Sequence, residues 1–295
     1  MHSIDPLSLR LFVAVAEAGT IAAAAEREHI AAAAVSRRIS EIEAMFGVPL
    51  LHRTNKGVVP TEAGERLVAL ALSALHHFDD IALQMRDFTN GLSGMVRIAA
   101  NNSSIVQFLP QDIQSFAASH PNVRLQVDEK PSMQVVRAIA DNAADIGVFT
   151  AVPHGRAIQT LPYRTDNLVL VTPPGHALSL RNSIAFAEAL DFEFVVLPAD
   201  TAISQCLTRA ANEDGRAVNV RIQVTGYDAQ CLMIGAGLGL GVMPDAVARQ
   251  HARSSGLCVV ALTDKWAARE LLIGMRSLDA LPEACRKLVA HLAAV

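Results

Sequence analysis

The sequence predicts an α/β chain built in three parts, because three kinds of pattern follow one another along its 295 residues. Apolar residues recur at helical spacing in short segments, then along one long segment, and finally in strands that alternate with helices. The chain is 51% apolar and 18% charged, which is typical of a folded protein with a large core. Its length suits two or three domains.

Composition and cysteine placement limit the class of protein. No stretch near the N-terminus is apolar enough for a signal peptide, and no run approaches the roughly 18 to 20 apolar residues that cross a bilayer. We therefore expect a soluble, cytoplasmic chain. The cysteines Cys206, Cys231, Cys258 and Cys285 lack partners at metal-binding spacing, so we expect buried thiols, with a redox switch at Cys206 as the minor alternative.

The first 46 residues predict three short helices. Asp5 and Pro6 are a typical start for the first helix, and Gly19 ends it. Thr20 can cap the second helix. The third helix follows a short turn and ends near Phe46, before a glycine and a proline.

The third helix has an apolar stripe and an opposite face of small residues. A helix whose exposed face is small residues with one arginine can enter a major groove deeply, whereas an ordinary solvated face is the alternative. Arg38 lies near the flank of the stripe, so we expect it to bind a phosphate or an intramolecular carboxylate. The stripe consists of Val35, Ile39, Ile42 and Phe46, and the candidate DNA contacts are Ala32, Ala33, Ser36, Arg37 and Ser40.

A basic hairpin follows these helices. The turn from Thr54 to Gly57 separates two short apolar strands. Arg53, Asn55 and Lys56 near its tip would contact the sugar-phosphate backbone or the minor groove. A hairpin of this kind directly after a helix-turn-helix predicts a winged helix-turn-helix that binds double-stranded DNA. The net charge of −4 leaves this open, because local placement of basic residues decides phosphate contacts.

A long helix should run from a cap at Thr61 to about Phe88. Its apolar residues recur at alternating steps of four and three, which is the heptad pattern of paired helices. We therefore expect a homodimer or homotetramer, with packing on its own domain as the alternative. The seam comprises Leu67, Ala71, Ala74, Phe78, Ile81, Met85 and Phe88.

The stretch from Leu9 to Gly64 resembles the N-terminal domain of the LysR-type transcriptional regulators. The resemblance rests on "FVAVAEAGT", "AVSRRI", "FGVPLLHRT" and "TEAG" at the usual intervals. It implies a DNA-binding regulator with a dimerising linker helix, and RNA polymerase is a further candidate partner. Ala31 to Ala33 fall where the family often has serine, glutamine and proline, and Glu28 replaces a common leucine. Ala32 has no side-chain amide, so it cannot form the pair of hydrogen bonds by which asparagine or glutamine recognises adenine in the major groove.

From Met95 onward, strands alternate with helices, which predicts a mainly parallel, open α/β sheet. We expect strands at Met95–Ala100, Val123–Val127, Asp145–Phe149, Leu168–Thr172, Phe194–Leu197, Arg221–Val224, Leu240–Met243 and Glu270–Met275. We expect helices from Asn101 through Ser119 and at Met133–Asp141, Ile184–Leu190, Ile203–Glu213, Asp228–Ala236 and Pro282–Ala293.

The sequence predicts three parts: a DNA-binding domain (1–60), a linker helix (61–90) and an effector-binding domain (91–295). The last of these should have two lobes, one of about 94–165 with 265–295 and one of about 166–264. The family resemblance likewise implies an effector domain similar to a periplasmic solute-binding protein. Ligands of such folds bind beyond strand ends, in the cleft. The candidate effector contacts are Asn102, Ser103 and Ser104 from one lobe, Thr201 and Ser204 from the other, and Thr150 as a weaker candidate.

Hydroxyls and free backbone N–H groups at these positions favour a small anionic metabolite, although plain helix capping is the alternative. "GAGLGLG" (Gly235 to Gly241) ends a helix and enters a strand, so we interpret it as a cap and a close backbone approach rather than a nucleotide loop. We find no catalytic motif and expect no enzyme, cofactor or metal site. The alternatives are a solute-binding α/β protein whose first helices only oligomerise, and a DNA-binding protein without an effector.

Overall fold

The computed structural model describes residues 4–54, 57–90 and 93–294. The chain divides into two compact units, Met1–Gly91 with Asp141–Ala143, and Leu92–Ala140 with Ala144–Val295. In the described part of the chain, no helix is both long and apolar enough to cross a membrane.

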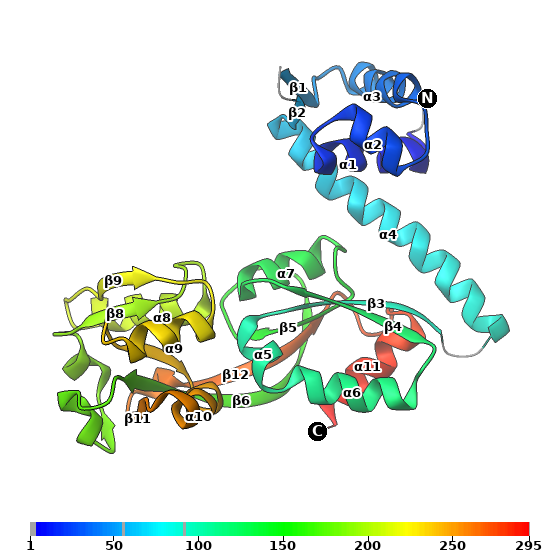
Figure 1. Cartoon of the computed structure of the whole chain (residues 1–295). Helices are drawn as coiled ribbons and strands as arrows, with labels where there is room; N and C mark the ends of the chain where they lie inside the picture. The colour runs from blue at the N-terminus through cyan, green and yellow to red at the C-terminus, as the bar shows by residue number, and fades with distance from the viewer. Residues whose placement is uncertain (1–3, 55–56, 91–92, 295) are drawn as a thin grey trace. The chain divides into compact units, whose positions relative to one another are not determined.

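The first unit contains the three predicted short helices, the hairpin and the long helix (Figure 1). Asp5 begins α1 by accepting the Ser8 backbone N–H, and Gly19 ends it in the left-handed conformation. Thr20 caps α2 in the same way. The elements are α1 (Pro6–Ala18), α2 (Ile21–Arg27), α3 (Ala32–Phe46), β1 (Leu51–Thr54), β2 (Gly57–Pro60) and α4 (Glu62–Asn90).

Two close contacts fix the hairpin against the helices. The Glu43 carboxylate accepts the backbone N–H groups of Leu50 and Leu51 at 2.8 and 3.2 Å, so the end of α3 holds the entry to β1. A Cβ at Gly57 would lie 2.3 Å from the Gly19 carbonyl oxygen, and Gly57 has φ +133°. Only glycine fits there, because the hairpin passes directly over the end of α1.

The predicted seam of α4 divides into two parts. Leu67 and Ala71 are buried in the core of the first unit, and Ala74 packs against that core. Phe78 and Ile81 are exposed. The prediction that the whole seam pairs with a second chain is therefore wrong for its first turns: a helix of 29 residues extends well beyond the small domain on which it begins to pack. The side chains of Met85 and Phe88 lie outside the described residues.

The second unit contains alternating strands and helices (Figure 1). Its strands are β3 (Gly94–Ala100), β4 (Val123–Glu129), β5 (Ile146–Thr150), β6 (Gln159–Thr172), β7 (Ser183–Ile184), β8 (Glu193–Val196), β9 (Asn219–Gln223), β10 (Gly241–Pro244), β11 (Cys258–Leu262) and β12 (Ala268–Met275). Its helices are α5 (Asn102–Gln107), α6 (Leu109–Ser119), α7 (Ser132–Ala140), α8 (Ala202–Glu213), α9 (Tyr227–Gly235), α10 (Asp245–Ser255) and α11 (Glu283–Ala293), with short 3₁₀ helices η1 (Ala177–Leu180), η2 (Phe186–Ala189) and η3 (Lys265–Ala267).

The main sheet is mixed, so the prediction of a mainly parallel sheet is wrong. Its strand order is β4-β3-β5-β12-β6-β11-β7, and β10 also pairs with β6. β3 is parallel to β4 and β5, whereas β12 is antiparallel to β5 and β6. The physical reason is that β12 returns from a distant part of the chain, and strand periodicity carries no information on the direction of such a return.

Buried apolar side chains form two separate cores in this unit. One core draws on residues between Val96 and Tyr163 and between Leu271 and Leu292, and we call the part built on it lobe 1. The other draws on residues between Leu168 and Ala267, and its surroundings are lobe 2. β6 and β12 run between the two (Figure 1), because the first half of β6 pairs with β12 and its second half with β10 and β11.

Three local predictions need correction. The helix expected through Ser119 breaks at Phe108, because Pro110 has no N–H to donate to the Val106 carbonyl and its ring would clash with that carbonyl in a continuous helix. The helix expected at Ile184–Leu190 is the strand β7 followed by η2, since Ile184 pairs with Leu262 of β11. Neither β11 nor α10 was predicted.

The glycine run at residues 235–241 lies where its interpretation placed it. Gly235 ends α9, and the run continues into β10. A Cβ at Gly239 would lie 2.8 Å from the Glu193 carbonyl oxygen, and the Leu240 N–H donates to that same oxygen. The run therefore serves a close approach of two backbones.

Candidate functional site

The face of α3 predicted to contact DNA is open in the first unit. Ala32, Ala33 and Ser40 are exposed, and Ser36 is partly buried. The Arg37 side chain is 74% exposed, and its Nε lies 3.5 Å from a Glu41 carboxylate oxygen one turn along the helix. A pair this exposed is weak, so the guanidinium can exchange the carboxylate for another acceptor at little cost.

Arg38 has an intramolecular partner. Its Nη1 donates to the Asp5 carboxylate at 2.9 Å and to Ser8 Oγ at 2.8 Å. Of the two alternatives that the sequence left open for this arginine, the structure shows the carboxylate. The hydrogen bonds that Ser8 donates, and then the charge of Arg38, hold the pKa of Asp5 below its usual value.

The hairpin has the expected form as far as it is described. β1 and β2 pair in antiparallel register, with Arg53 opposite Val58, and Thr54 Oγ1 donates to the Gly57 carbonyl at 3.1 Å. Asn55, Lys56 and the Arg53 side chain lie outside the described residues. Their contacts with DNA stay a prediction.

The second unit contains a cavity of about 240 Å³ between its lobes. Both lobes contribute to its wall, through the loops that follow β3, β4 and β8. The cavity is lined by Asn101, Asn102, Ser103, Glu129, Lys130, Pro131, Ser132, Leu197, Pro198, Asp200, Thr201, Ala202, Ile203, Thr225, Tyr227 and Arg269.

Half of the predicted effector contacts line this cavity. These are Asn102, Ser103 and Thr201. The other half are buried and do not line it, contrary to the prediction: Ser104, Thr150 and Ser204.

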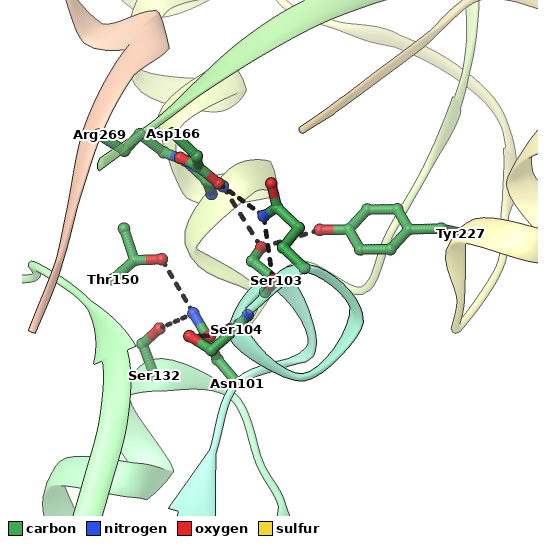
Figure 2. A network of polar contacts seen from close by, with 9 residues as sticks. Asn101, Ser103, Ser104, Ser132, Thr150, Asp166, Tyr227 and Arg269 are labelled. Atoms are coloured by element: carbon green, nitrogen blue, oxygen red, sulfur yellow. Dashed lines mark hydrogen bonds and ion pairs between the residues drawn. The ribbon is translucent and has the colours of Figure 1, made fainter. Parts of the chain in front are cut away.

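The buried side chains behind the wall already have partners (Figure 2). Asn101 Oδ1 accepts the Ser104 N–H at 3.0 Å and its hydroxyl at 2.6 Å, and Asn101 Nδ2 donates to Thr150 Oγ1 at 2.9 Å. Ser204 Oγ donates to the Leu197 carbonyl at 2.8 Å. These groups position the loops of the wall rather than face a ligand.

A hydrogen-bond network joins the two lobes at the cavity (Figure 2). Ser103 Oγ, from lobe 1, lies 3.0 Å from the Tyr227 hydroxyl of lobe 2 and accepts from Arg269 Nη2 at 3.3 Å. Arg269 forms an ion pair with Asp166, and Gln107 Nε2 donates to the same carboxylate at 3.0 Å. Burial raises the pKa of Tyr227 to about 12, so its hydroxyl stays protonated at neutral pH.

Sequence reasoning missed Tyr227, Asp166 and Arg269. Asp166 and Arg269 lie opposite each other in the register of β6 and β12, at the point where these strands run between the lobes. Asp166 lies two residues before the strand predicted at Leu168–Thr172, and Arg269 lies one residue before the strand predicted at Glu270–Met275. Their pairing depends on a contact across 103 positions of the sequence, which the sequence pattern does not show.

The arrangement defines a class of protein before any comparison is made. A winged helix-turn-helix with an open, small-residue face is a DNA-binding module, and two lobes around a polar cavity are typical of small-molecule sensing. Together they define a ligand-responsive DNA-binding regulator.

Comparison with known proteins identifies the family. Residues 7–65 match the family described as "Bacterial regulatory helix-turn-helix protein, lysR family", and residues 89–295 match the family described as "LysR substrate binding domain". The chain therefore belongs to the LysR family of transcriptional regulators, with a DNA-binding domain followed by an effector-binding domain. This confirms the resemblance and the fold class seen in the sequence.

Individual relatives are distant but extend over most of the chain. The HTH-type transcriptional regulator YbhD of Escherichia coli (strain K12) is 24% identical over 285 residues, which cover 97% of this chain and 90% of YbhD. The solved structure of CbnR, a LysR family transcriptional regulator, superimposes with a TM-score of 0.75 at 20% identity and covers 99% of both chains. Full-length CbnR in complex with its target DNA gives a TM-score of 0.74 at 20% identity, again with 99% of both chains covered.

Proposed function

We propose that this regulator binds an operator through α3 and the hairpin, and that a small metabolite in the cavity between its lobes controls that binding. The observation that carries the proposal is the polar cavity itself, to which both lobes contribute and across which Ser103 contacts Tyr227. A ligand that contacts both lobes favours the closed arrangement, and such differential affinity is what an effector needs.

The proposed DNA contacts begin with Arg37, which is the exposed arginine at the centre of a small-residue face. Ser36, Ser40 and the methyl groups of Ala32 and Ala33 would follow the groove, with the hairpin on the adjacent backbone. Double-stranded DNA is the proposed partner, and CbnR, which has this fold, was solved with its target DNA. RNA polymerase is the further partner proposed from the family.

The proposed assembly is a homodimer or homotetramer that forms through the exposed part of α4. Phe78 and Ile81 are more than half exposed on that helix, although they continue the stripe that is buried closer to α1. A symmetric dimer presents two recognition helices to a partly palindromic site and doubles the phosphate contacts. We propose that the chain acts in the cytoplasm and has no enzymatic activity.

We further propose that the effector carries an acidic group. Ser103 and Arg269 bring a hydroxyl and a guanidinium group to the cavity wall, whereas the Thr201 hydroxyl donates to the Pro198 carbonyl at 2.7 Å. Donors of this kind recognise carboxylates and other oxyanions.

Calorimetry combined with DNA footprinting tests this function. A metabolite library is screened by thermal shift, and each hit is titrated into the full-length chain by calorimetry. We expect a hit that loses affinity in Ser103→Ala and that changes the footprint on genomic fragments recovered with the protein. A ligand confirmed in the cavity that leaves the footprint unchanged would contradict the proposal.

Two alternatives give different results in this experiment. A DNA-binding protein that no ligand controls would give a footprint that no compound changes. A solute-binding protein without DNA binding would give hits in the cavity and no preference for any duplex.

A further inference from the structure

The wall of the effector cavity carries charges of both signs. Glu129 and Lys130 come from lobe 1, Asp200 comes from lobe 2, and Arg269 lies on β12 where that strand runs between the lobes. Arg269 is already neutralised, because its Nε donates to Asp166 Oδ1 at 2.8 Å and the two side chains are only 4% and 3% exposed. The remaining charged groups of the wall are the carboxylates of Glu129 and Asp200 and the ammonium group of Lys130. The wall therefore has an excess of negative charge.

The neighbouring amides do not change this balance. Asn102 Nδ2 donates to Glu129 at 2.6 Å, and Gln134 Nε2 donates to Asp200 at 3.3 Å. Both donors are neutral, so they orient the carboxylates without removing their charge. A purely anionic ligand would meet repulsion from both acids, whereas a cationic group would be attracted to both.

The position of the two acids links charge to the closing of the lobes. Glu129 ends β4 of lobe 1, and Asp200 precedes α8 of lobe 2. Both carboxylates would attract a ligand cation placed between the two walls. A ligand with an ammonium group that contacts both carboxylates would therefore favour closure of the lobes.

Two buried polar atoms of the lining residues lack partners among the described residues. They are Arg269 Nη1, a donor, and Asn102 Oδ1, an acceptor. The Arg269 side chain is only 4% exposed, so bulk water does not supply the missing acceptor. A carboxylate oxygen is the kind of group that would satisfy the first atom, and an ammonium N–H is the kind that would satisfy the second.

Part of the remaining wall is apolar, and the volume of the cavity is small. Leu197, Pro198 and Ile203 of lobe 2 and Pro131 of lobe 1 supply hydrocarbon surface. At about 240 Å³, the cavity is below the roughly 300 to 1,000 Å³ of sites for drug-sized ligands. It therefore suits a compact molecule with one short apolar group.

We infer that the effector is a small zwitterion, of the chemical class of aliphatic α-amino acids. Its carboxylate faces Ser103 and Arg269, and its ammonium group faces Glu129 and Asp200. This inference rests on the proposed function and narrows the acidic effector proposed above to one that also carries a positive charge.

Three probes that share one carbon skeleton test the inference on the full-length chain. They are valine, 3-methylbutanoate (valine without its ammonium group) and 2-methylpropylamine (valine without its carboxylate), and succinate is added as a dianion. Calorimetry measures each dissociation constant. We expect valine to bind at least roughly tenfold more tightly than either single-charge analogue, because a site built to hydrogen-bond a group rejects the analogue that lacks it.

Variants of the acids supply a second readout. In Glu129→Gln with Asp200→Asn, valine should bind more weakly and 3-methylbutanoate more tightly, so the preference for the zwitterion narrows or reverses. Both acids are exposed, so the variant should fold. The control is Asp128→Asn, which changes the neighbouring carboxylate of β4 that does not line the cavity. It should leave both dissociation constants unchanged.

The outcomes separate this inference from the proposed function. Tighter binding of succinate or of 3-methylbutanoate than of valine, with a change in the DNA footprint, overturns the zwitterion and keeps the effector. Preferred binding of the amine overturns it equally. If valine, alanine, leucine and the other probes all fail to bind at millimolar concentration while a compound from the library binds and changes the DNA footprint, the inference is wrong and the proposed function stands.

Discussion

Two consecutive arginines on α3, Arg37 and Arg38, differ in exposure and in their partners. Arg37 is exposed and weakly paired, whereas Arg38 bonds the start of α1 through Asp5 and Ser8. Neighbouring positions on a helix lie about 100° apart, so one arginine can face solvent while the next ties two helices together. The two should therefore have separable effects on DNA binding and on stability.

Arg37→Ala should weaken operator binding by about 1–3 kcal/mol, since it removes a base or phosphate contact, and should leave the unfolding midpoint nearly unchanged. Fluorescence anisotropy at fixed salt measures the affinity. Arg249→Ala is the matched control, because Arg249 forms the same kind of exposed i,i+4 pair, with Asp245, in the second unit. Equal losses in both variants would contradict the assigned role.

Asp5 should give the first unit a pH-dependent contribution to stability. Its pKa in the folded state is lowered, by the hydrogen bonds from Ser8 first and by the Arg38 charge as well. A lowered folded pKa means that the contribution is fully present above the unfolded value near 3.8 and is lost as the pH falls through the folded pKa. Asp5→Asn keeps the helix cap but cannot ionise. Thermal unfolding from pH 6 to pH 3 should show the advantage of the wild type shrinking below pH 4, and a constant difference would contradict this.

The buried pair of Asp166 and Arg269 should be the most sensitive polar contact of the second unit. Both side chains are almost fully buried, so removing one charge leaves the other uncompensated. We expect Asp166→Asn to lower the free energy of unfolding by about 3–5 kcal/mol. Chemical denaturation checks this, and the double variant Asp166→Leu with Arg269→Leu should fall closer to the wild type than the single one. A loss under about 1 kcal/mol would mean that water reaches the pair.

At the scale of elements, α4 shows the limits of periodicity. The heptad steps from Leu67 to Phe88 predict one apolar stripe, but a stripe does not state which surface covers it. The domain at the start of the helix covers Leu67 and Ala71, whereas Phe78 and Ile81 are exposed and can contact a second chain. Helix boundaries followed the capping residues closely, because Asp5, Thr20 and Gly19 act on their immediate neighbours.

The exposed part of the stripe should hold the oligomer together. Phe78→Ser with Ile81→Ser should weaken self-association by about 3 kcal/mol or more, given the roughly 1.5–3 kcal/mol gained by burying each such side chain. Sedimentation over a range of concentrations measures it. Leu180→Ser is the control, because Leu180 is a 91% exposed leucine of the second unit with no predicted role in pairing. An unchanged association constant in the double variant would assign the interface to another surface.

At the scale of the whole second unit, the lobes communicate through two crossing strands and one hydroxyl pair. β6 and β12 pass between the cores, and Ser103 contacts Tyr227 across the cavity. We expect the chain to bend where these strands leave each lobe, and we expect the hydroxyl pair to favour the closed form.

Tyr227→Phe should shift the lobes toward the open form. The loss of one hydrogen bond is worth about 0.5–1.5 kcal/mol, so the balance should move by roughly 2- to 10-fold. Hydrogen exchange at α5 and α9 should then accelerate between pH 6 and pH 8, where the wild-type hydroxyl is protonated because its pKa is about 12. Tyr163→Phe is the control: Tyr163 donates to Asp112 at 2.5 Å within lobe 1, so it should lower stability without a selective change at α9. Equal acceleration in both variants would contradict the role of Tyr227.

The sequence by itself determined the local elements and the family. Helix caps, the small-residue face of α3 and most strands depend on residues that are close along the chain, and the motifs from Leu9 to Gly64 suffice to indicate the kind of regulator. Ser103 and Thr201 were found because residues that follow a strand and begin a helix share an edge of an α/β fold.

Only the tertiary structure decided the strand directions, the core that covers the first turns of α4, and the charge of the cavity. Asp166 meets Arg269, and Ser103 meets Tyr227, across more than a hundred positions of the sequence. The partner of a charge determines whether it is available to a ligand, and no periodicity records a partner that distant. For that physical reason, the sequence could locate the walls of the site, and only the folded chain could show which of their charges are left for an effector.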